Sequence, residues 1–189
     1  MSHRRTLFIT QVALMVALAV VVRRLATPQV PMLNLGGLPI ILAGLILGPL
    51  AGACTGAISD VLGYFFVAVG PYHPAFTLTA ALTGALPPLI LRGLPGRAAS
   101  VADESVARLA VAIFIGQTIT KVGMKPFIMH ELFGWSIWLT AKVNLVVQLV
   151  HAPLYAVVAR PLLRAVTHSR RVPAVPGQDP MPYVEQRSA

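Results

Sequence analysis

Charged side chains are scarce in this chain of 189 residues, where aspartate, glutamate, lysine and arginine together make up 11% of the sequence. Hydrophobic residues make up 56%, and the mean hydropathy is +0.75. A soluble domain of this length needs a charged surface towards water, so the composition excludes the ordinary globular class. It is typical of a protein that lies in a lipid bilayer.

Cysteine is almost absent: Cys54 alone cannot form a disulfide framework or a cysteine-based metal site within one chain. The sequence also lacks a Walker A lysine loop, an HExxH motif and a GxSxG motif. His73 and His130 flank loops, but their spacing gives little support for paired metal ligation. We therefore expect no metal and no cofactor.

The apolar residues form six runs separated by turn signals or polar stretches. Gly48 and Pro49 mark a hinge, and Gly52 and Gly56 indicate a helix that packs closely against its neighbours. We expect one all-α transmembrane domain over residues 1–166, with six spanning helices at 7–22, 38–50, 51–69, 75–91, 109–124 and 135–163. We expect loops at 70–74, 92–108 and 125–134, a kink at Pro153, and a disordered cytoplasmic tail over 167–189.

Basic residues are unevenly divided between the two ends of these spans. The side with both termini receives nine arginines, namely Arg4, Arg5, Arg92, Arg97, Arg108, Arg160, Arg164, Arg170 and Arg171. The other side receives Arg23, Arg24, Lys121, Lys125 and Lys142. The positive-inside rule then places both termini in the cytoplasm. The same rule explains the net charge of +9 without nucleic-acid binding.

The five basic residues on the outer side run against that rule, and two interpretations stay open. Long cationic side chains near the end of a span often extend to the lipid headgroups. Alternatively, the five residues line a positive cavity for an anionic or polar small molecule. Asp60, the only acid within the first four runs, has a similar pair of interpretations: contact with a ligand, or an interhelical contact near Tyr64.

Polar residues also recur at helical spacing in the last two runs. Asn144, Gln148 and His151 share one face of the sixth, and a second set shares one face of the fifth, namely Gln117, Thr120, Lys121 and Met124. Such stripes face protein or water rather than lipid. They predict either a binding site or polar packing between the two helices.

Five stretches of the chain carry a resemblance to a known family, and together they fall within residues 33–92. They are LGGLPIILAG (35–44), GPLAG (48–52), GAISD (56–60), LGY (62–64) and YHPAFTLTAALTG (72–84). They resemble the folate-type family of S components, the substrate-binding subunits of energy-coupling-factor (ECF) vitamin transporters. Outside this region the agreement is one of length and number of spans.

The resemblance implies a mechanism shared between chains. An S component captures a vitamin outside the cell with high affinity, and it is not an enzyme. It associates with a transmembrane T component and two cytoplasmic ATPases, and ATP hydrolysis drives it to topple in the bacterial cytoplasmic membrane and release the vitamin inside. Ala13 and Ala17 match the family's AxxxA pattern, which docks on the T component. Small residues one turn apart could equally mark packing within the chain.

For folate, the resemblance suggests stacking by Tyr72, Phe76 or Trp135 and guanidinium contacts to the carboxylates. Relatives often carry an arginine early in the sixth helix, where this chain has Lys142, which lacks the bidentate fork. The expected substrate-binding residues are Arg23, Arg24, Tyr72, His73, Phe76, Thr77, Lys121, Lys142, Asn144 and Gln148. An S component for a different vitamin, or a stand-alone channel or carrier, are the alternatives.

Overall fold

The structure is a computed structural model that describes residues 3–26, 35–66, 72–96, 98 and 100–171. Within these residues every regular element is helical. The helices are α1 (His3–Ala26), α2 (Gly37–Leu47), α3 (Pro49–Phe66), α4 (Pro74–Gly93), a 3-10 turn η1 (Val101–Asp103), α5 (Val106–Gln117), a π-helical segment η2 (Thr118–Met124), α6 (Lys125–Phe133) and α7 (Ile137–Arg171).

Four segments are long and apolar enough to cross a membrane: Arg5–Arg23, Pro74–Gly93, Val106–Phe133 and Ile137–Val166. The third of these joins α5, η2 and α6 into one continuous rod. The apolar helix α2 is shorter, and it meets α3 at Gly48, whose φ of 104° suits glycine. The expected hinge at Gly48 is thereby confirmed, and the chain is an all-helical membrane protein.

Two boundaries differ from the sequence-based prediction. The expected loop at 125–134 is wrong, because residues 125–133 form α6 and the chain turns only at Gly134, in a left-handed conformation. Polar residues lower the hydropathy there without breaking the helix. At the other end α7 continues to Arg171, past the expected start of the tail at residue 167, and residues 172–189 lie outside the described part.

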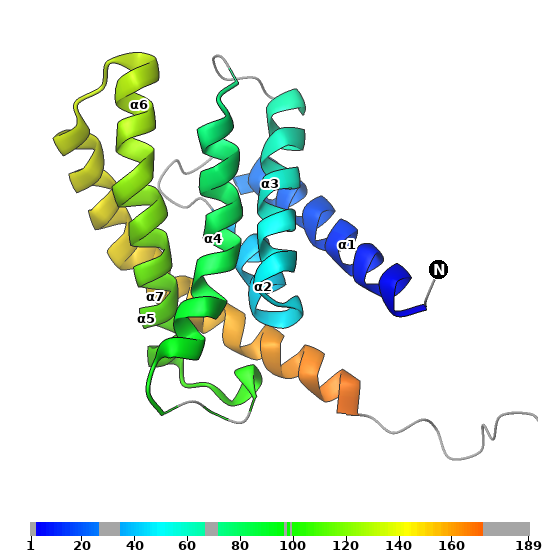
Figure 1. The fold of residues 1–189 in the computed structure, drawn as a ribbon. Helices are drawn as coiled ribbons and strands as arrows, with labels where there is room; N and C mark the ends of the chain where they lie inside the picture. The colour runs from blue at the N-terminus through cyan, green and yellow to red at the C-terminus, as the bar shows by residue number, and fades with distance from the viewer. Residues whose placement is uncertain (1–2, 27–34, 67–71, 97, 99, 172–189) are drawn as a thin grey trace, which may run out of the picture.

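The two ends of the bundle can be followed in Figure 1, where α7 changes direction along its length. At its upper end, which we call the Tyr72 end, α3 and α6 finish and α4 and α7 begin. At the opposite end, Arg108 donates hydrogen bonds to the carbonyls of Leu91, Leu94 and Gly96 and pairs with Glu104 at 3.3 Å. This clamp fixes the connection between α4 and α5, which was expected in this region.

Glycines let α2, α3 and α4 approach until their backbones touch. A Cβ placed on Gly52 would lie 2.7 Å from the Cα of Gly44, and one on Gly84 would overlap the carbonyl oxygen of Gly52. A Cβ on Gly56 would overlap the carbonyl oxygen of Ala80. We call Gly44, Gly52, Gly56 and Gly84 the glycine seam. It confirms the close packing that Gly52 and Gly56 indicated.

The main hydrophobic core lies between α2, α5 and α7, around Ile41, Leu109, Ile113 and Ala156. Helix α1 packs at the side of the bundle, against α2 and α3 (Figure 1). The layout leaves the two bundle halves to meet near the Tyr72 end, where the polar residues gather.

Candidate functional site

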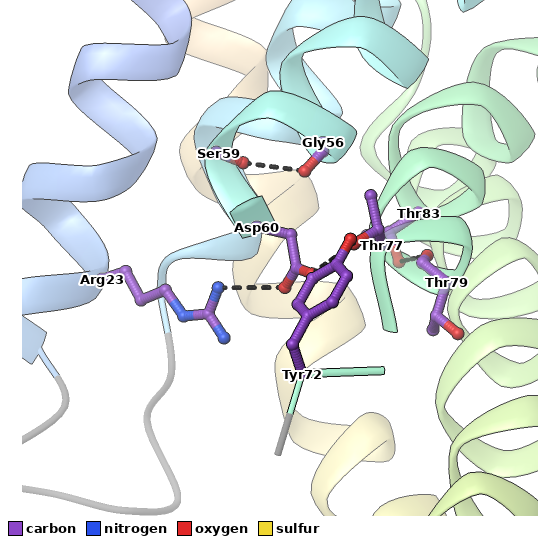
Figure 2. A network of polar contacts seen from close by, with 8 residues as sticks. All are labelled: Arg23, Gly56, Ser59, Asp60, Tyr72, Thr77, Thr79 and Thr83. Atoms are coloured by element: carbon purple, nitrogen blue, oxygen red, sulfur yellow. Dashed lines mark hydrogen bonds and ion pairs between the residues drawn. The ribbon is translucent and has the colours of Figure 1, made fainter. Parts of the chain in front are cut away.

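The first group of polar residues surrounds Asp60 on α3 (Figure 2). Its carboxylate accepts a hydrogen bond from Thr77 Oγ1 at 3.0 Å and pairs with the guanidinium of Arg23 at 3.4 Å. Tyr72 lies 2.8 Å from the same Thr77 oxygen. Because the Thr77 proton goes to Asp60, the Tyr72 hydroxyl is the donor in that contact. We call these four residues the Asp60 network, and it joins α1, α3 and α4.

The Asp60 network decides between the two interpretations of Asp60. Its side chain is 14% exposed, whereas that of Arg23 is 51% exposed, so the carboxylate lies inside the network and the guanidinium at its edge. Arg23 also packs over Gly63, where a Cβ would come within 3.2 Å of the guanidinium. Asp60 therefore makes interhelical contacts, as one of the two interpretations held, with Arg23 and Thr77 as partners.

Aromatic and imidazole rings border this network at the start of α4. The rings of Tyr64 and Tyr72 lie 5.2 Å apart, and Phe76 is half-buried one turn into α4. His73 Nδ1 accepts a hydrogen bond from the Ala75 N–H at 3.2 Å, so its ring caps the helix. This contact gives His73 a structural role at its Nδ1 atom.

The second group of polar residues lies between α5, η2 and α7. Gln117 and Gln148 are 0% exposed, and His151 is 2% exposed. Within the described residues, both amide atoms of each glutamine and Nε2 of His151 have no hydrogen-bond partner. Tyr155, also fully buried, is hydrogen-bonded to the backbone of Gly37 at the start of α2. We call Gln117, Gln148, His151 and Tyr155 the buried polar cluster.

Two lysines lie beside this cluster. The Nζ atom of Lys121, in the π-helical segment, lies 5.9 Å from the ring centre of Tyr155. Lys121 and Lys125 are half-buried and repel each other, and Lys125 also feels the charge of Arg23. Within the described residues no carboxylate lies within 4.0 Å of either lysine. The half-buried positive charge at the Tyr72 end is therefore not neutralised by those residues.

The structure thus sorts the predicted substrate-binding residues into groups. Arg23, Tyr72 and Thr77 belong to the Asp60 network, with His73 and Phe76 next to it. Lys121 and Gln148 belong to the second group, and Asn144 lies one turn from Gln148 with a buried Nδ2 that has no partner in the described residues. Lys142 is exposed, and the side chain of Arg24 lies outside the described residues.

Sequence reasoning missed two features of this region. Tyr155 reads as an ordinary core aromatic in an apolar helix, and no signal in the sequence links it to Lys121. The π-helical segment was not foreseen either, and such segments are frequent at functional sites because they widen one turn and shift the residues that follow.

Ala13 and Ala17 are exposed on α1, beside Leu14 and Leu18, which are 65% and 44% exposed. The buried face of α1 consists instead of Val12, Val16 and Ala19. The AxxxA face does not pack within the described part of this chain, so the internal-packing interpretation is wrong. The face is open to lipid or to another protein.

The fold and these polar groups inside it are those of a multi-pass membrane protein with a polar interior. The sequence model of the family described as "ECF-type riboflavin transporter, S component" matches residues 4–168. The folate transporter FolT of Clostridium novyi (strain NT) is 30% identical over 148 residues, which cover 77% of this chain and 81% of that protein.

The chain belongs to the S-component family of ECF transporters. It is accordingly a transport protein rather than an enzyme, as the sequence led us to expect. The two comparisons carry the names of different vitamins, riboflavin and folate.

Proposed function

We propose that this chain is the high-affinity substrate-binding subunit of an ECF-type ABC transporter, which imports folate or a related anionic vitamin across the bacterial cytoplasmic membrane. In this proposal six helices span the bilayer, both termini lie in the cytoplasm, and the Tyr72 end faces outwards. The excess of arginine on the opposite side supports this orientation. A T component and two ATPases supply the energy.

The observation that carries the choice of an anionic vitamin is the pair Lys121 and Lys125. Both are half-buried, they repel each other, and no described carboxylate lies within 4.0 Å of them. Bringing two like charges together in a partly buried site is costly unless an anion compensates them. Folate carries two carboxylates at neutral pH, whereas riboflavin has no charge. A folate-like anion therefore suits the lysines better.

Arg23 takes a different role in this proposal from the one expected. Its guanidinium is held by Asp60 at 3.4 Å, so it does not offer an uncompensated charge. It is a positioning residue that holds the end of α1 near Tyr72 and Thr77. Arg24 remains a candidate for contact with a carboxylate.

Titration calorimetry of purified protein tests the substrate. Lys121→Met preserves the length of the side chain and should weaken folate binding about tenfold to a hundredfold, as expected for loss of a charge-assisted hydrogen bond of about 1.5–3 kcal/mol. Lys142→Met, at an exposed lysine, provides the comparison and should change affinity much less. Folate binding that is insensitive to Lys121→Met and Lys125→Met would remove the lysines from the site.

Riboflavin is the second candidate, because the matching family is described by that vitamin. A site for riboflavin would bind it with an affinity that Lys121→Met leaves unchanged, since the vitamin has no charge to lose. Uptake by the chain alone, without a co-expressed T component and ATPases, would instead support a stand-alone carrier and contradict the proposal.

A further inference from the structure

The buried polar cluster poses a question that the lysines do not answer. Gln117 on α5 and Gln148 on α7 are fully buried, and four amide atoms between them lack hydrogen-bond partners in the described residues. A buried polar atom without a partner is costly, and two complete amides are unusual in one helix interface. The Lys121 contact with Tyr155 shows that the two helix faces meet here.

His151 adds an acceptor to this cluster. Its Nδ1 atom lies 2.9 Å from the carbonyl oxygen of Val147. A carbonyl can only accept, so Nδ1 carries the proton and Nε2 of the neutral ring has a free lone pair. Nε2 is buried and has no partner in the described residues. The cluster therefore presents two donor–acceptor amides and one acceptor at the same level of the bundle.

A primary amide matches a flat ring edge in which a ring N–H stands beside a carbonyl, because its C=O accepts from the one while its N–H donates to the other. The pterin ring of folate and the isoalloxazine ring of riboflavin both carry such a cyclic-amide edge. The rest of the two vitamins differs, above all in charge.

We propose that Gln117 and Gln148 bind the cyclic-amide edge of the vitamin's ring, and that Nε2 of His151 accepts from a neighbouring N–H of that ring. This inference rests on the proposed function and deepens it: the buried polar cluster recognises what folate and riboflavin share, and Lys121 recognises what distinguishes them. The rival explanation is that the amides satisfy each other or ordered water and serve only to pack α5 against α7.

The experiment uses two isosteric variants, Gln117→Met and Gln148→Met, with Gln11→Met on α1 as the matched control. Titrations with the vitamin that the wild type binds are combined with competition by fragments. Pterin and lumichrome represent the rings without their tails, and p-aminobenzoylglutamate represents the tail of folate without its ring.

Each cluster variant should weaken binding of the whole vitamin and of the ring fragments about tenfold, as for loss of one to two hydrogen bonds. Binding of p-aminobenzoylglutamate should stay within about twofold, whereas Lys121→Met should give the opposite pattern. The melting temperature of the ligand-free protein should stay equal or rise, because methionine removes a buried amide that has no partner.

Ring affinity that is unchanged in both cluster variants overturns the inference and leaves the proposed function intact. Equal losses for ring, tail and ligand-free stability identify the glutamines as packing residues and overturn it too. If the wild type binds neither folate nor riboflavin, the proposed function itself fails.

Discussion

Gly84→Ala should destabilise the protein although it adds a single methyl group. The new Cβ would overlap the carbonyl oxygen of Gly52, which belongs to the backbone of α3 and cannot rotate away. Overpacking of this kind costs about 1–3 kcal/mol, and a rigid backbone neighbour places it in the upper half of that range. Alanine recovers about 0.5–1 kcal/mol of helix propensity. The expected net loss is about 1–2.5 kcal/mol.

Gly93→Ala on the same helix is the matched control, because nothing lies within 4 Å of its added Cβ. For a chain of this size about 1 kcal/mol corresponds to about 2–4 °C in Tm. Thermal unfolding in detergent, followed by tryptophan fluorescence, should therefore show Gly84→Ala lower by about 2–10 °C and Gly93→Ala unchanged or slightly higher. Equal melting temperatures for the two variants would refute the backbone contact between α3 and α4.

Three further predictions follow from contacts elsewhere in the bundle. In a double-mutant cycle of Arg23→Ala and Asp60→Asn, the coupling energy in thermal unfolding should be about 0.2–1 kcal/mol, because Arg23 is half-exposed; zero coupling would remove the ion pair. Ala17→Leu should leave vitamin binding intact and impair uptake into cells, since its side chain lies on the exposed face of α1; loss of binding as well would contradict a docking role. Glu104→Gln should cost about 1–3 kcal/mol of stability, because Glu104 is 3% exposed and compensates Arg108; a melting temperature like that of wild type would show that the carbonyl contacts of Arg108 suffice.

Hydropathy and turn chemistry were enough to predict most of the helices. The junction at Gly48 and Pro49 follows from residues that cannot continue a regular helix, and Tyr72 and His73 lie in a connection, as expected. The expected loop at 125–134 failed because hydropathy measures affinity for lipid, while α6 needs only helical backbone geometry. Pro126 sits in the first turn of α6, where proline is tolerated.

The site could be predicted only as a set of residue types. Spacing correctly put Gln148 and His151 on one helix face, but no pattern tells which face of α7 meets Lys121. The partner of Arg23 lies 37 residues away on another helix. A single sequence contains no signal for that distance, so Arg23 was expected to bind substrate when its guanidinium is held by Asp60.

The division between the glycine seam and the buried polar cluster bears on how such proteins diversify. The seam joins α2, α3 and α4 through backbone contacts that tolerate almost no substitution. The cluster and Lys121 lie on α5, η2 and α7, and their side chains can change without disturbing those contacts. New ligand preferences can therefore evolve, or be selected in a laboratory library, in the second half of the chain while the first half stays constant.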